Sequence, residues 1–73
     1  MKEKISLERI EDSTERNIIL LLQEKDKCMM GDILMNLKLS YQKGLQHINS
    51  LLDKNWISNT ENAPYFTLKV EFE

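Results

Sequence analysis

The chain has 73 residues and a net charge of −2, and 41% of its residues are hydrophobic and 30% charged. This length allows one domain with a modest core, and the composition is typical of a globular protein and excludes a disordered one. The longest apolar run, residues 18–22, is too short to span a membrane, and the single cysteine excludes an internal disulfide. Because the N-terminus also lacks an apolar signal segment, we expect a cytoplasmic protein.

The positive charge is concentrated in the middle of the chain. Residues 29–57 carry three lysines and two aspartates, whereas the segments on both sides are net negative. Phosphate contacts favour basic faces, so the total charge argues against a strong nucleic-acid binder, and the middle segment is the only net-positive one.

Residues 1–12 form an N-terminal arm with an ambiguous pattern. Ile5 and Leu7 alternate as in a strand, whereas Leu7 and Ile10 are spaced as in a helix. Two interpretations stay open: the arm packs on its own domain, or it pairs with a second copy in a dimer.

The first helix is predicted to begin near Ser13 or Thr14, either of which could cap it. Glu15 suits the positive end of the helix dipole. Residues 18–22 form a broad apolar face, and the charged residues 24–27 end the helix.

A short apolar link at residues 28–30 leads to a second helix. Free cysteine is among the most buried residue types, so we expect Cys28 to be a buried structural residue. The second helix should begin at Gly31 or Asp32 and end at Lys38. Its inward face is predicted to hold Ile33, Leu34 and Leu37.

The third helix is predicted over residues 41–54, directly after a short turn. Ser40 is placed to cap it, and Asn55 can adopt the left-handed conformation that ends a helix. A glycine inside a helix often permits the close approach of another backbone, so Gly44 predicts tight packing against the second helix. The two segments together predict a helix–turn–helix. The inward face of residues 41–54, the second helix of this motif, is predicted to hold Gly44, Leu45, Ile48, Leu51 and Leu52.

The C-terminal segment changes to the period of a β-strand. Trp56 begins one strand and is expected in the core, residues 60–64 form a turn-rich loop, and residues 65–72 alternate as a half-buried strand. The prediction is a mainly α fold with a small antiparallel β-hairpin (α+β), in one domain over residues 13–73.

Four short motifs appear in this order along the chain: GDIL at 31–34, LS at 39–40, HINSLLDKNWI at 47–57 and YFTL at 65–68. Their order and spacing resemble the winged helix-turn-helix domains of bacterial and archaeal regulators of the ArsR and MarR kind. The resemblance covers about residues 13–70 and implies three helices plus a wing, with DNA bound by the third helix. The chain departs from that pattern in its wing loop, which contains Glu61 and no lysine or arginine.

The outer face of the third helix suggests how DNA would be read. Gln and Asn side chains can bond an adenine edge in the major groove, and Lys can reach guanine or phosphate. We expect base contacts from Gln42, Lys43, Gln46 and Asn49, and phosphate contacts from Lys38 and Tyr41. The same polar face is also common on a merely solvated helix. The full set of candidate DNA-binding residues adds Ser40 and Lys54, with Asn59, Thr60, Asn62 and Tyr65 in the wing.

Other kinds of site find little support in the sequence. No nucleophile–base pair, phosphate-binding glycine loop or paired carboxylate motif is visible, so we do not expect an enzyme. His47 is expected to be a helix-surface residue, because no cysteine, histidine or carboxylate lies near it at metal-binding spacing. The paired-cysteine metal box of the arsenic-sensing regulators is absent, so no metal or cofactor is predicted.

The leading hypothesis is therefore a small transcriptional regulator that binds double-stranded DNA sequence-specifically, as a homodimer. The alternative is a winged-helix module for protein–protein interaction without DNA binding, which the acidic charge would suit. In that case the exposed strand edge at residues 70–72, or the arm, would carry the partner.

Overall fold

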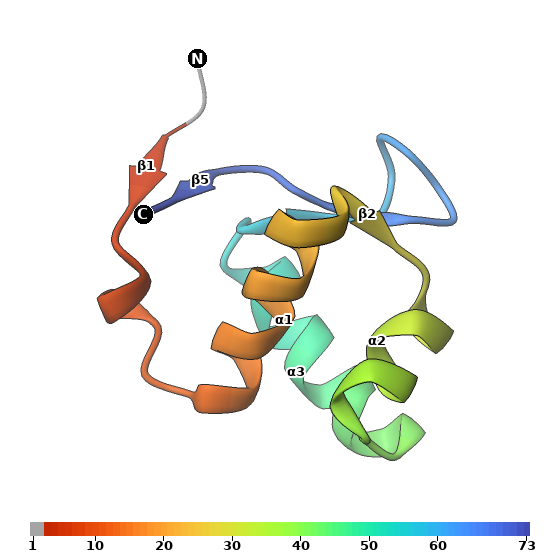
Figure 1. The fold of residues 1–73 in the computed structure, drawn as a ribbon. Coiled ribbons are helices and arrows are strands. Elements are labelled where there is room, and N and C mark those ends of the chain that lie inside the picture. The colour runs from red at the N-terminus through yellow and green to blue at the C-terminus, as the bar shows by residue number, and fades with distance from the viewer. Residues whose placement is uncertain (1–2) are drawn as a thin grey trace.

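The fold, seen in a computed structural model that describes residues 3–73, combines helices with short strands (Figure 1). Its α+β class was predicted. The three α-helices of the described residues are α1 (Ser13–Lys25), α2 (Met30–Leu37) and α3 (Tyr41–Asp53). None of them is long and apolar enough to cross a membrane.

A three-stranded antiparallel sheet lies beside the helices, with strand order β2-β4-β3. Its strands are β2 (Lys27–Cys28), β3 (Ile57–Ser58) and β4 (Phe66–Leu68). The predicted hairpin is present as β3 and β4, with Ile57 opposite Leu68. The prediction of a link at residues 28–30 missed one strand. Cys28 belongs to β2 and pairs with Phe66 on the other edge of β4.

The prediction of one continuous strand over residues 65–72 was wrong. The chain leaves β4 after Leu68, and β5 (Glu71–Phe72) pairs with a different partner, β1 (Lys4–Ile5), in parallel. The hairpin is short because α3 ends just before it, so few residues remain opposite β4. Its last bond joins the Lys69 N–H to the Trp56 carbonyl oxygen at 2.9 Å. Alternating burial nevertheless continues through Val70 and Phe72, which are both buried.

Residues 3–12 pack on their own domain, which is one of the two interpretations of the arm. The Glu71 N–H donates to the Glu3 carbonyl oxygen at 2.7 Å, and Ile5 and Ile10 are buried. A 3₁₀-helix, η1 (Leu7–Arg9), lies between them. Residues 1–2 of the predicted arm lie outside the described residues, and pairing with a second copy stays a prediction.

The core joins all three helices to both sheets. Burying these aliphatic side chains supplies the main driving force for folding. Trp56 is half-buried, and its ring makes a T-shaped contact with that of Phe72 at a centroid distance of 5.5 Å. Cys28 is buried, as predicted. The least exposed core side chains are Ile10, Ile18, Ile19, Leu22, Cys28, Ile33, Ile48, Leu51 and Ile57.

The cap of α1 differs from the prediction. Asp12, not Ser13 or Thr14, precedes the helix, and its Oδ1 accepts the Glu15 N–H at 3.0 Å. Aspartate is as good a cap as serine, and the arm delivers Asp12 in the extended conformation that a cap requires.

The segment around the third helix follows the prediction closely. Ser40 Oγ accepts the Lys43 N–H at 3.3 Å, and Asn55 adopts a left-handed conformation with φ of 61°. The second helix begins one residue before the predicted Gly31, and Lys38 ends it in a left-handed conformation with φ of 56°. The third helix ends at Asp53 rather than at residue 54.

Gly44 brings α2 and α3 close together, as predicted. It is buried, and a Cβ built on it would overlap Leu34 Cδ2 from the facing helix. The missing side chain therefore makes room for Leu34, and this contact sets how α3 lies against α2.

Candidate functional site

The third helix presents three different faces along its length. Its inner face packs into the core through Gly44, Ile48 and Leu51. The opposite face is exposed and polar, and a lateral face between these two turns toward α1. The lateral face carries His47 and Ser50, and Lys54, the C-cap residue directly after the helix, continues it. The three residues follow one another at helical i, i+3 and i+7 spacing.

The structure brings most of the predicted DNA-contacting residues to the outer face and to the start of α3. Gln42, Lys43, Gln46 and Asn49 are all exposed. Tyr41 is 62% exposed, unusually high for a large ring. Lys38 and Ser40 are exposed in the turn just before the helix, so seven predicted residues lie within residues 38–49.

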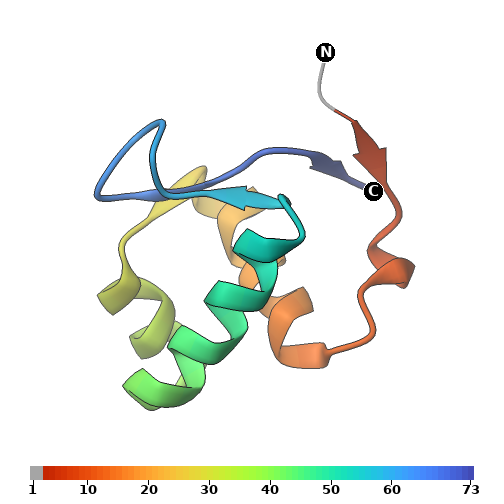
Figure 2. The same ribbon diagram turned by 180° about the vertical axis from the view of Figure 1, so that it is seen from behind.

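The loop between β3 and β4 carries the other predicted residues. Asn59, Thr60 and Asn62 are exposed, and Tyr65 is half-buried. In both views this loop and the beginning of α3 lie on the side of the molecule away from β1 and β5 (Figures 1 and 2). Ser58 Oγ accepts the Thr60 N–H at 3.3 Å, which fixes the start of the loop.

A basic residue beside this loop was missed in the sequence. Lys27 Nζ lies 4.7 Å from the centroid of the Tyr65 ring. The two residues meet because β2 pairs with β4, and no spacing pattern could have indicated a contact across so much sequence. The loop itself has no lysine or arginine, so Lys27 supplies positive charge next to it.

Lys54 is the predicted DNA-binding residue whose surroundings differ most from the expectation. Its ammonium lies 3.2 Å from Glu15 Oε1 and 4.8 Å from the centroid of the Trp56 ring. DNA contact by Lys54 stays a prediction, but its charge is already paired within the chain.

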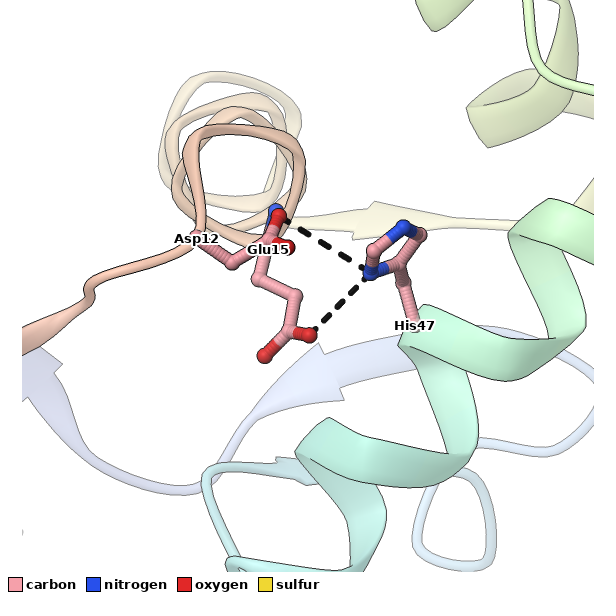
Figure 3. A group of neighbouring side chains, drawn as sticks. All are labelled: Asp12, Glu15 and His47. Atoms are coloured by element: carbon pink, nitrogen blue, oxygen red, sulfur yellow. Dashed lines mark hydrogen bonds and ion pairs between the residues drawn. The ribbon is translucent and has the colours of Figure 1, made fainter.

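Glu15 lies at the centre of a polar cluster between α1 and α3 (Figure 3). Its side chain is 9% exposed, and a buried carboxylate is costly unless it is paired and hydrogen-bonded. The lateral face of α3 supplies these partners. Glu15 Oε2 lies 3.1 Å from His47 Nδ1, and Oε1 accepts Ser50 Oγ at 3.4 Å in addition to Lys54.

Asp12 completes this cluster and corrects the expectation for His47. Asp12 Oδ1 lies 3.8 Å from His47 Nδ1. One ligand atom each from Asp12, Glu15 and His47 lies within 4.8 Å of the other two. The prediction that no carboxylate lies near His47 was therefore wrong. The partners come from the start of α1, 32 residues away in the case of Glu15, so local spacing could not indicate them.

Among residues 3–73, the pKa values of two titratable groups are shifted by their surroundings. The backbone hydrogen bond from the Glu15 N–H is the main cause that lowers the pKa of Asp12, and the charge of His47 assists. Burial raises the pKa of the Cys28 thiol, and the charge of Asp32 adds to this effect. A raised pKa leaves less thiolate at neutral pH, which agrees with a structural cysteine.

An open cavity of about 660 Å³ lies between the end of α1, β4 and the loop before it. Its lining includes the carboxylates of Asp26, Glu61 and Glu71 and the ammonium of Lys27. This acidic balance does not suit an anionic ligand, and the lining holds no histidine, cysteine or serine.

No protein-family model matches the chain, and no curated protein or solved structure matches it either. Its function is therefore inferred from its own residues: the outer face of α3 and the cluster around Glu15.

Proposed function

We propose that the chain is a winged helix-turn-helix domain that binds double-stranded DNA sequence-specifically, as a small transcriptional regulator. In this proposal α2 and α3 form the helix-turn-helix, α3 enters the major groove, and the loop at residues 59–64 is the wing. Helix-turn-helix proteins read bases chiefly from the beginning of the second helix of the motif.

The outer face of α3 is the observation that carries the proposal. Gln42, Gln46 and Asn49 are exposed together on one side of a helix whose other sides are held by α1 and α2. None of the three side chains has a hydrogen bond among those found within residues 3–73. Amide side chains can donate to and accept from one adenine edge at the same time, which makes this face suitable for reading bases.

Three lysines would hold the phosphates in this mode of binding. Lys38 and Lys43 flank the start of α3, and Lys27 lies beside the loop. Phosphate contacts position a protein on the duplex without specifying sequence. Because three cations per chain give weak binding, we propose a homodimer that places two α3 helices about 34 Å apart, one turn of DNA.

Fluorescence anisotropy on labelled duplex DNA of mixed sequence, at about 50 mM salt, tests the proposal. The native chain should bind, and Lys43→Glu combined with Gln46→Ala should abolish binding. Lys4→Glu is the matched control, because it changes an exposed lysine of β1 by the same charge, on the side of the molecule away from the loop and the beginning of α3. Absence of binding by a folded native chain would reject the proposal.

The alternative is a protein-interaction module, which the net charge of −2 and the acidic loop residue Glu61 favour. Its expected docking edge at residues 70–72 is not open, because β5 pairs with β1 and the Phe72 carbonyl oxygen accepts Gln23 Nε2 at 2.8 Å. A partner that binds equally well after the change of Lys43 and Gln46 would favour this alternative.

A further inference from the structure

Asp12, Glu15 and His47 bring two carboxylates and one imidazole together where α1 meets α3. Two carboxylate oxygens face one imidazole nitrogen, at 3.1 Å from Glu15 and 3.8 Å from Asp12 (Figure 3). A single ring nitrogen carries at most one hydrogen, so it can donate to only one of the two carboxylates, and Asp12 Oδ1 accepts the Glu15 N–H at 3.0 Å instead. A metal ion at this point would contact all three groups.

We propose that Asp12, Glu15 and His47 form a binding site for a divalent transition-metal ion such as Zn²⁺. Zinc lies about 2.1 Å from nitrogen and oxygen ligands, which places the ligands of a tetrahedral ion about 3.4 Å from one another. The separations of His47 Nδ1 from Glu15 and from Asp12, 3.1 and 3.8 Å, lie on either side of this value. The third separation, between Asp12 and Glu15, is at most 4.8 Å, so a bound ion would draw the side chain of Asp12, which is 45% exposed, toward Glu15.

The ligand types select the class of metal. Imidazole suits zinc, nickel and similar ions, whereas magnesium and calcium prefer sites made of oxygen alone. The coordination that remains would be filled by water, because His47 is 21% and Asp12 45% exposed on one side of the cluster.

The charge of the cluster also favours a cation. Two carboxylates face one ammonium, that of Lys54, so the cluster is net negative when His47 is neutral. Lys54 contacts Oε1 of Glu15, whereas His47 contacts Oε2. A metal on the Oε2 side would therefore leave the Lys54 contact in place.

A bound ion would join the start of α1 to the middle of α3. Ligands that bind only the folded state stabilise it, so the melting temperature should rise with the logarithm of the metal concentration once that concentration exceeds Kd. The site lies on the lateral face of α3, beside the outer face, and does not depend on DNA binding.

Isothermal titration of ZnCl₂ into the native chain, in a buffer without chelator, tests the site. We expect one ion per chain, a rise of several degrees in Tm, and no comparable effect of MgCl₂. The chain has one histidine, so the imidazole signals in a ¹H–¹⁵N NMR spectrum report on His47 alone. The Nδ1 signal should move on addition of Zn²⁺.

Two conservative variants keep the fold and remove ligands. Asp12→Asn retains a capping oxygen, and His47→Gln retains a donor toward Glu15. Each should weaken Zn²⁺ binding at least tenfold, whereas Asp53→Asn, an exposed carboxylate on the same helix, should not. If the native chain binds Zn²⁺ more weakly than millimolar, or if all three variants bind it as tightly as the native chain, the three residues form an ordinary ion-pair cluster and the proposal is overturned.

Discussion

Glu15 of α1 and His47 of α3 meet at 3.1 Å between Oε2 and Nδ1, although 32 residues separate them in the sequence. This contact lies between the N-terminal end of one helix and the lateral face of another. It ties the lateral face of α3 to α1, in addition to the packing of Gly44, Ile48 and Leu51 in the core.

Replacing Glu15 should therefore destabilise the fold. Glu15→Ala removes the partner of three polar groups, and we expect the free energy of unfolding to fall by about 1–3 kcal/mol. Lys54 is 45% exposed at its side chain, so solvent screening keeps its share of this loss small. Urea denaturation measures the change. Glu24→Ala, an exposed glutamate on the same helix, is the control and should lie within about 0.5 kcal/mol of the native chain.

Asp12 should stabilise α1 in a pH-dependent way. Asp12→Ala should cost about 1 kcal/mol at neutral pH, whereas Ser13→Ala should cost little because Ser13 is not the cap. The folded state lowers the pKa of Asp12, so its stabilising effect is complete above the ordinary value of 3.8 and is lost as the pH falls through the lower folded pKa. The stability difference between the native chain and Asp12→Asn should accordingly shrink below about pH 4. A difference independent of pH would contradict this role.

The sequence predicted the local structure of the middle of the chain well, because the signals there are local. Ser40 and Asn55 mark the two ends of α3, and both behave as their residue types predict. The errors fall where distant segments meet. Nothing near Leu68 in the sequence indicates that the last strand leaves the hairpin to pair with β1, because that pairing joins the two ends of the chain.

Gly44 should be coupled to Leu34 across the α2–α3 contact. Alanine gains about 1 kcal/mol over glycine inside a helix, but at this position its Cβ displaces Leu34 Cδ2. We expect Gly44→Ala to stabilise the chain in the Leu34→Ala background and to lose most or all of that gain in the native background. A double-mutant cycle measures the coupling. Gly31→Ala, where no atom lies within 4 Å of the new Cβ, should show no such coupling.

In the candidate site too, local features were predictable from the sequence and contacts between distant segments were not. The outer face of α3 follows from helical period, so Gln42, Gln46 and Asn49 could be grouped from the sequence. The surroundings of Lys54 and the position of Lys27 depend on which strand or helix lies next to them, and periodicity carries no information about that. His47 was misjudged for the same reason.

Lys27 should contribute to DNA affinity but not to its sequence preference. Each lysine that contacts a phosphate adds about −0.9 to the slope of log K against log salt concentration. Lys27→Gln should therefore make the slope shallower by about one unit and weaken all DNA sequences equally, whereas Lys4→Gln, on β1 at the opposite side of the molecule, should leave the slope unchanged. Anisotropy titrations between about 50 and 200 mM salt measure both slopes. Equal slopes for Lys27→Gln and the native chain would remove Lys27 from the interface.

The proposal that α3 reads DNA is tested most directly by NMR titration of a ¹⁵N-labelled chain with duplex DNA at low salt. The proposal predicts the largest shifts at the backbone amides of Gln42, Lys43 and Gln46 and at the side-chain amides of the two glutamines, with smaller shifts at Asn59 and Asn62 of the loop. An unchanged spectrum at about 50 mM salt, or shifts confined to β1 and β5 at the opposite side of the molecule, would contradict it.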